Sequence, residues 1–178
     1  RVVRHLKLYV SYFQEGRVID RDLYKNSPVL VDLDETRLEQ LSRPLYMELV
    51  GSPSGYQLEM FFDEEDSKKV TYSTSLKEFP TTIDTKYGTL LFQRNPIYEA
   101  QTMSLQEADT EDAEQEHFGK LKITIYPLKD MARSYAKRLS AAPTSKTTTV
   151  ANVGILDTKK ARALDYLREW RHTRKTMN

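Results

Sequence analysis

The stretch Gly119-Lys120-Leu121-Lys122-Ile123-Thr124-Ile125-Tyr126-Pro127 decides the fold class of this chain. From Leu121 to Ile125 apolar side chains alternate with polar ones, which is the pattern of a strand with one buried face. Pro127 ends the strand and suits the first turn of a helix. The apolar residues that follow recur at helical spacing: Leu128, Met131, Ala132, Tyr135, Ala136 and Leu139. A strand that leads directly into an amphipathic helix predicts a domain that mixes helices and sheet.

The rest of the C-terminal third repeats this order. Ala141-Ala142-Pro143 is expected to end the helix, and Thr147-Thr148-Thr149-Val150 favours a strand over residues 147–156. Asp157 or Thr158 would then cap a final helix. The apolar face of that helix comprises Ala161, Leu164, Leu167 and Trp170. Because strands joined through a helix are connected by a right-handed crossover, we expect the two strands to be parallel.

Toward the N-terminus, the sequence is predicted to be mainly β. After a short helix over residues 2–8, alternating or apolar runs predict strands at 8–13, 18–23, 29–33, 45–50, 56–62, 69–74 and 89–93. Gly51-Ser52-Pro53-Ser54-Gly55 is typical of a hairpin turn. The sequence therefore predicts an α/β (α+β) fold, a mixed β-sheet flanked by helices, in a single domain over residues 1–178. Its parts are a β-rich half (1–95), an acidic loop (100–118) and a strand–helix–strand–helix region (119–175).

Composition excludes several classes of site. The chain has no cysteine, so disulfides, thiolate zinc sites, iron–sulfur clusters and cysteine nucleophiles are excluded. The sequence contains no run of eighteen apolar residues and no secretory signal pattern. Because the chain starts at Arg1 and not at Met, we expect it to be a fragment of a longer protein, so that the absence of a membrane segment is a property of the fragment and not of the parent.

The charges are segregated along the chain. Residues 61–118 carry 5 basic and 13 acidic side chains, whereas residues 119–178 carry 14 basic and 4 acidic ones. A basic third can bind a polyanion or a membrane surface, and it can also neutralise the acidic middle within the fold or between subunits. We prefer neutralisation, because the net charge of the whole chain is only +1.

Acidic residues crowd into one polar stretch, which we interpret as a solvated loop. They are Glu107, Asp109, Glu111, Asp112, Glu114 and Glu116. The glycine and the ligand spacing of a helix–loop–helix calcium site are absent from it. His117 lies beside Glu114 and Glu116 and could touch a metal ion, but we predict no metal site.

No catalytic signature is present. The sequence lacks Gly-x-Ser-x-Gly, His-Glu-x-x-His and the phosphate-binding Gly-x-x-x-x-Gly-Lys-Ser/Thr. We therefore predict no catalytic residue and no cofactor for this chain. Lys120, Lys122 and Tyr126 fit a nucleic-acid template only in part, and no nucleic-acid partner is expected.

The final helix is strongly basic, through Lys159, Lys160, Arg162, Arg168, Arg171, Arg174 and Lys175. One interpretation is a solvated helix face. The other is a helix that packs against a neighbouring subunit, with Arg162, Arg168, Trp170 and Arg171 as the candidate oligomer interface.

Two regions resemble the periplasmic domain of Wzz/Wzc-type polysaccharide co-polymerases, in particular Bacteroidetes-like members with a cytoplasmic tyrosine autokinase. The first is Val-Val-Arg-His-Leu-Lys-Leu-Tyr-Val-Ser-Tyr-Phe from residue 2, with Asp22-Leu23-Tyr24-Lys25-Asn26-Ser27-Pro28-Val29. The second comprises Ile123-Thr124-Ile125-Tyr126-Pro127, a helix with Ala132, Tyr135 and Leu139, a strand over 150–156, and Asp157-Thr158-Lys159-Lys160-Ala161. The resemblance covers residues 1–33 and 119–170. Leu164-Asp165-Tyr166-Leu167 departs from the family, whose final helix often has a Leu-Asn pair.

The resemblance implies a Wzz base-domain-like fold in the periplasmic part of a bacterial inner-membrane protein. Such proteins form homo-oligomeric rings and control the chain length and export of capsular polysaccharide, exopolysaccharide or O-antigen, together with polymerase and export proteins. The parent is expected to carry a tyrosine-protein kinase, with ATP as its cofactor, outside this chain. The chain itself is expected not to be an enzyme.

Three alternatives remain open on the sequence. The first is an O-antigen chain-length regulator without a kinase. The second is a module whose basic third binds an anionic glycan directly. The third is a hydrolase without a recognised motif.

Overall fold

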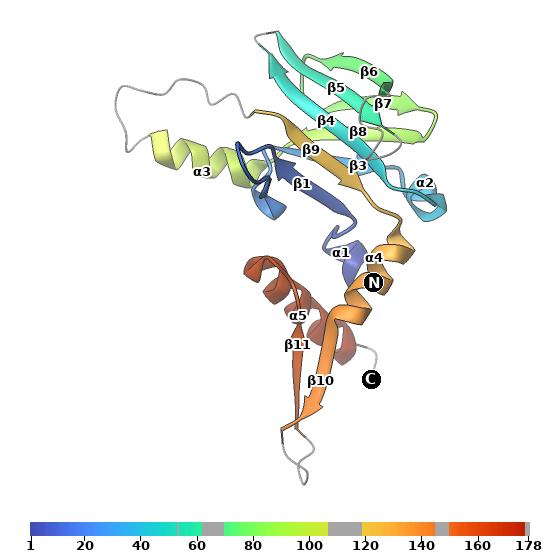
Figure 1. Ribbon diagram of the computed structural model, residues 1–178, viewed down its shortest axis with the longest axis vertical. Helices are drawn as coiled ribbons and strands as arrows, with labels where there is room; N and C mark the ends of the chain where they lie inside the picture. Colours follow the sequence, from blue (N-terminus) through green and yellow to red (C-terminus); the bar gives the residue numbers. More distant parts are fainter. Residues whose placement is uncertain (53, 62–69, 107–118, 145–149, 177–178) are drawn as a thin grey trace. The chain divides into compact units, whose positions relative to one another are not determined.

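The computed structural model describes residues 1–52, 54–61, 70–106, 119–144 and 150–176, except for the side chains of residues 105 and 106. It confirms the mixed α+β class, with several sheets and flanking helices (Figure 1). The sequence predicts one domain, and the chain forms two compact units. Unit 1 consists of Arg1–Tyr9 and Tyr126–Asn178, and unit 2 of Val10–Ile125.

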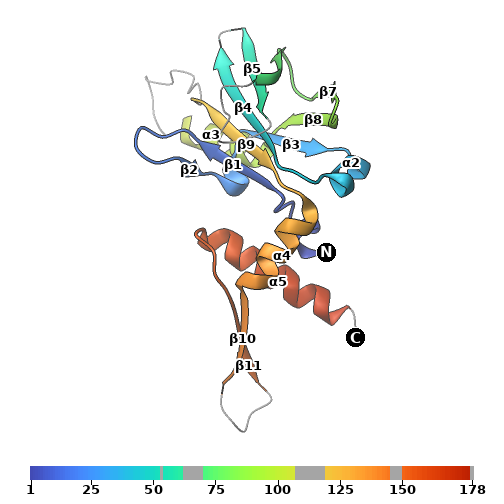
Figure 2. The same ribbon diagram turned by 45° about the vertical axis from the view of Figure 1, so that its right-hand side comes forward.

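Unit 2 is built on a six-stranded antiparallel sheet in the order β2-β1-β9-β4-β5-β6 (Figure 2). Its strands are β1 (Val10–Gln14), β2 (Arg21–Asp22), β4 (Leu45–Ser52), β5 (Gly55–Phe61), β6 (Val70–Leu76) and β9 (Leu121–Ile125). The predicted strand in the stretch 119–127 is therefore β9, and it lies between β1 and β4. Ile123 pairs with Tyr12 on one side and with Met47 on the other. Leu121, Ile123 and Ile125 are buried, as their alternation predicts.

A second, three-stranded antiparallel sheet completes unit 2, in the order β3-β8-β7. It comprises β3 (Val29–Leu33), β7 (Thr81–Thr85) and β8 (Gly88–Arg94). The Tyr12 side chain of β1 connects this sheet to the six-stranded one. Its buried hydroxyl accepts a hydrogen bond of 2.9 Å from the Val31 backbone N–H and lies 3.5 Å from the Val31 carbonyl oxygen. This contact satisfies backbone groups of an edge strand that would otherwise be buried without a partner.

Short helical elements connect the strands of unit 2: η1 (Tyr24–Asn26), α2 (Glu35–Gln40) and α3 (Pro96–Gln106). Asn95, which is 2% exposed, fixes the start of α3. Its side-chain amide donates 2.7 Å hydrogen bonds to the carbonyl oxygens of Lys25 and Ser27, and its Oδ1 accepts one from the Ile97 N–H. The expected loop 100–118 is therefore wrong over 100–106, which are helical. Residues 107–118, with the acidic cluster and His117, lie outside the described residues.

Unit 1 combines three helices with one hairpin. Its elements are α1 (Val2–His5), α4 (Leu128–Arg138), β10 (Leu139–Pro143), β11 (Ala151–Ile155) and α5 (Lys160–Lys175). Residues 139–143 form a strand, although the sequence predicts a helix end there. β10 pairs antiparallel with β11, with Leu139 opposite Ile155.

The expected parallel crossover is therefore wrong. Only residues 144–150 connect β10 to β11, whereas a parallel connection needs about a dozen residues or more. All strand pairs in the described ranges are antiparallel. The predicted strand at 147–156 corresponds to β11, and residues 147–149 lie outside the described part of the chain.

Candidate functional site

A buried carboxylate organises the start of α5. The Asp157 side chain is 0% exposed, and Arg162 reaches it with two nitrogen atoms. Arg162 Nη2 donates to Asp157 Oδ1 at 2.6 Å, and Arg162 Nε donates to Oδ2 at 2.9 Å. The backbone N–H of Lys159 also donates to Oδ1, at 2.9 Å. Asp157 thus binds the first turn of the final helix, although Lys159 and not Asp157 is the N-cap residue.

The Asp157 carboxylate also contacts a residue of α4. Arg138 Nη1 lies 3.8 Å from Asp157 Oδ2, and the Arg138 guanidinium lies 4.0 Å from the centre of the Tyr135 ring. Tyr135 stacks on Tyr166 of α5, with ring centres 4.9 Å apart and ring planes 16° apart. We call Tyr135, Arg138, Asp157, Arg162 and Tyr166 the Asp157 cluster. The bidentate pair of Arg162 with Asp157 lies at the start of α5 itself. The Tyr135–Tyr166 stack and the ion pair of Arg138 with Asp157 join α4 to it.

The electrostatics of the Asp157 cluster favour a structural role. Burial raises the pKa of Asp157, but hydrogen bonds from Arg162 and from the Lys159 backbone, with the nearby Arg138, outweigh burial and lower it below its ordinary value. Burial raises the pKa of both Tyr135 and Tyr166. The carboxylate is therefore ionised and the tyrosine hydroxyls are neutral near pH 7. A carboxylate whose pKa is lowered by the arginine that binds it is a weak proton acceptor, and its two oxygens are already engaged by Arg162, as in a structural ion pair.

The Asp157 cluster also fixes the rotation of α5, and two residues of the predicted apolar face turn out to lie outside the core. Tyr166 is the buried residue of this helix. Ala161 and Leu164, which the helical spacing assigned to the core, are exposed, and Leu164 retains 42% of its surface. Apolar periodicity alone does not predict the burial of Tyr166. The available signal was the spacing of Arg162 and Tyr166, which are four residues apart and therefore lie on the same helix face.

The structure separates the four candidate interface residues into two kinds. Arg162 is 15% exposed and is bound to Asp157 within its own unit, so it presents no free charge outward. Trp170 is half-buried, and the Arg174 guanidinium lies 5.0 Å from its ring centre. Arg168 and Arg171 are exposed, and neither has an acidic partner among the residues that the structure describes. The outward basic surface of α5 comprises Lys160, Arg168, Arg171, Arg174 and Lys175.

Lys122 of β9 and Lys120 just before it do not form a comparable basic surface, because acidic side chains of neighbouring strands and loops surround them. Lys120 Nζ lies 3.2 Å from Glu48 and 3.9 Å from Glu15. Lys122 Nζ lies 2.8 Å from Asp20 and 3.7 Å from Glu15. The hydrogen bond between Lys122 and Asp20 lowers the pKa of Asp20 and raises that of Lys122. Both lysines are therefore neutralised within unit 2.

Within the described ranges, no three His, Asp or Glu side chains are grouped so as to hold a metal ion. None of the helices that the structure describes combines the length and the apolar composition needed to span a bilayer. No protein-family model and no curated protein sequence matches the chain.

Proposed function

We propose that this chain is the non-catalytic periplasmic domain of a bacterial inner-membrane polysaccharide co-polymerase. In this role it assembles into a ring with copies of itself and controls the length or export of a capsular or extracellular polysaccharide. The parent protein carries a cytoplasmic tyrosine kinase, which uses ATP, outside these residues. This assignment rests on the resemblance of residues 1–33 and 119–170 to that family.

One structural observation supports the proposal. The two regions that carry the resemblance are far apart in sequence, yet they meet in the fold. In unit 2, Val10 of β1 pairs with Ile125 of β9. In unit 1, α1 lies against α4 and α5, and His5 Nε2 is 3.9 Å from the Glu169 carboxylate. Both chain ends belong to unit 1 (Figure 2).

The outward basic surface of α5 supplies a means of assembly. In a head-to-tail ring, Arg168 and Arg171 of one subunit contact the acidic stretch 61–118 of the next subunit. Such complementary charges orient subunits and set the register of the ring.

The test is made in the full-length parent protein in its host. Arg168→Glu together with Arg171→Glu is expected to reduce the fraction of the protein in rings, measured by native electrophoresis after detergent extraction, and to change the length distribution of the polysaccharide. Lys129→Glu with Lys137→Glu is the matched control, because it changes the charge equally at exposed positions of α4. Unchanged rings and unchanged polymer lengths in the α5 variant contradict the interface. Unchanged polymer lengths after deletion of the gene contradict the function.

The same strain separates the kinase-linked protein from a chain-length regulator without a kinase. Phosphotyrosine on the purified parent protein is expected. Its absence, together with an altered polymer length after gene deletion, identifies the simpler regulator.

A further inference from the structure

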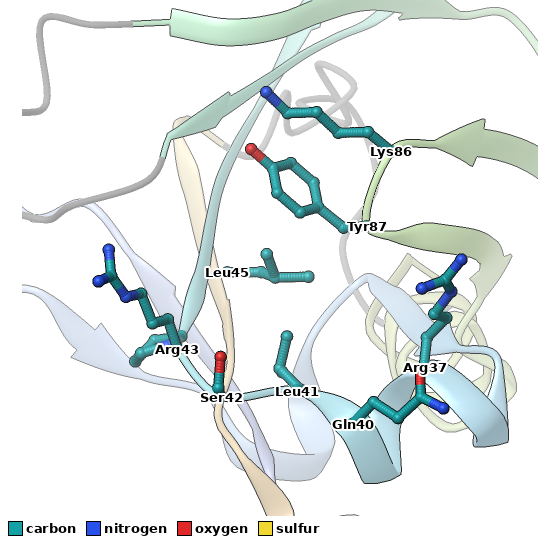
Figure 3. A pocket seen from close by; sticks show the side chains of 9 residues that line it. Arg37, Gln40, Leu41, Ser42, Arg43, Leu45, Lys86 and Tyr87 are labelled. Atoms are coloured by element: carbon teal, nitrogen blue, oxygen red, sulfur yellow. The ribbon is translucent and has the colours of Figure 1, made fainter.

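Unit 2 contains a pocket of about 250 Å³ where α2, its connection to β4 and the turn between β7 and β8 meet (Figure 3). Nine residues line it: Arg37, Gln40, Leu41, Ser42, Arg43, Pro44, Leu45, Lys86 and Tyr87. Its volume lies just below the roughly 300–1,000 Å³ of sites for drug-sized ligands. The pocket therefore suits a single ring-sized group.

The charged residues that line this pocket are all positive. Arg37, Arg43 and Lys86 come from three different segments, and no Asp or Glu is among the lining residues. Neither Arg37 nor Arg43 has an acidic partner in the part of the chain that the structure describes. Lys86 Nζ lies 5.1 Å from the centre of the Tyr87 ring. Unneutralised guanidinium groups beside a concave surface favour a carboxylate or phosphate, which they bind through paired hydrogen bonds.

The remaining lining residues favour a ring with one apolar face and a polar rim. Figure 3 shows Leu41 and Leu45 between Arg43 on one side and Arg37 on the other, with the Tyr87 ring above Leu45. Gln40 and Ser42 add side-chain donors and acceptors at the edge. An aromatic ring and aliphatic side chains contact the C–H face of a sugar, while the polar groups bind its hydroxyls.

The backbone and the stem of Arg37 are held by their surroundings before any ligand binds. The Asp34 carboxylate accepts one hydrogen bond from the Arg37 backbone N–H and one from the Thr89 N–H, each of 3.0 Å, and so connects α2 to β8. Gly88, at φ +129°, makes room for the stem of Arg37. A Cβ atom at this glycine would lie 2.7 Å from Arg37 Cγ and 2.9 Å from Arg37 Cβ. The arginine stem therefore packs directly on the backbone of the β7–β8 turn, which reduces the ordering that binding would require.

We propose that this pocket binds one acidic sugar residue, a uronate, through Arg37 and Arg43, with the sugar ring against Tyr87 and the leucines. The choice of an anion rests on the pocket alone, whereas the choice of a sugar rests also on the proposed function. On this proposal, an anionic glycan binds to unit 2 and not to the basic C-terminal third of the chain.

The test is a titration of the isotope-labelled 178-residue chain with D-glucuronate, followed by amide chemical shifts. Saturable shifts at Leu41, Lys86 and Tyr87 are expected, with weak or no shifts from D-glucose or acetate at the same concentration. Arg37→Gln with Arg43→Gln is expected to lower the affinity at least ten-fold, since each charged hydrogen-bond pair that is lost contributes to binding. Arg17→Gln with Arg21→Gln is the matched control, because it removes the same charge at exposed positions of unit 2 away from the pocket.

Three results overturn the inference: no saturable shift with glucuronate, equal affinity in the Arg37/Arg43 variant and the control, or acetate bound as tightly as glucuronate. The outcome is separable from that of the proposed function. If glucuronate does not bind but gene deletion still alters the polysaccharide, only the pocket inference fails. If glucuronate binds and gene deletion leaves the polysaccharide unchanged, only the proposed function fails.

Discussion

Replacing Arg162 by alanine is expected to lower the free energy of unfolding of unit 1 by about 3 kcal/mol. The substitution leaves the fully buried Asp157 carboxylate with the Lys159 N–H at 2.9 Å and Arg138 at 3.8 Å. Removal of one partner from a buried ion pair costs roughly 3–5 kcal/mol. The lower end applies here because Arg162 is 15% exposed and Arg138 remains nearby.

Trp170 makes this loss measurable. It is the single tryptophan of the chain and lies on α5, so its fluorescence during urea unfolding reports on unit 1. With a dependence on urea of roughly 2 kcal/mol per M, the midpoint is expected to fall by about 1.5 M. Arg162→Lys, which keeps the charge but not the two parallel hydrogen bonds, is expected to give an intermediate midpoint.

The control is Arg168→Ala, on the same helix but exposed, for which a change of no more than about 0.5 kcal/mol is expected. If the midpoints of Arg162→Ala and Arg168→Ala coincide, the Asp157 ion pair does not stabilise unit 1 and the argument is refuted.

Two further predictions concern acid stability and the joint between the sheets. The pKa of Asp157 is lower in the folded protein than in the unfolded chain, so its contribution is present above about pH 3.9 and is lost as the pH falls through the folded value. Thermal melting followed at Trp170 is therefore expected to show a steeper loss of stability below pH 4 for the wild type than for Asp157→Asn, and parallel curves would contradict this. Tyr12→Phe leaves the buried Val31 N–H without its 2.9 Å acceptor and is expected to cost about 2 kcal/mol in unfolding followed by circular dichroism. The same change at the half-exposed Tyr72 is the control, and an equal effect of the two substitutions would count against the proposed role of Tyr12.

Local sequence patterns were sufficient to predict a strand with one buried face, and to predict its pairing where the partner strand is close in sequence. The alternation in Leu121–Ile125 predicts both the strand and its buried side chains, and the glycines around residues 51–55 predict the β4–β5 hairpin. The position of β9 between β1 and β4 was not predictable in this way, because pairing between strands remote in sequence leaves no local signal. The prediction of parallel strands was wrong for a related reason. The helix was predicted to continue to residues 141–143, whereas α4 ends at Arg138 and β10 follows it directly.

The candidate site was predictable only as an excess of charge. Counting basic residues identified α5 but could not distinguish Arg162, which is paired inside its unit, from Arg168 and Arg171, which face outward. That distinction depends on Asp157, which precedes the helix. Its carboxylate contacts Arg162 only because the chain turns at residues 157–159, and this turn is not visible in a count of charges. The pocket was not predictable at all, since Arg37 and Arg43 meet Lys86 and Tyr87 only through the packing of α2 near the β7–β8 turn.

The position of β9 also governs how the chain folds during synthesis. The hairpin β4–β5 and then β6 can pair as soon as they leave the ribosome, but β1 and β4 expose unpaired edges until Leu121–Ile125 has been made. Exposed strand edges recruit strands from other chains, and a missing central strand is readily supplied by a second copy. Slow synthesis before Leu121 at high concentration therefore favours strand exchange between copies, because it lengthens the time for which these edges are exposed, whereas prompt synthesis of β9 lets each sheet close around its own strand.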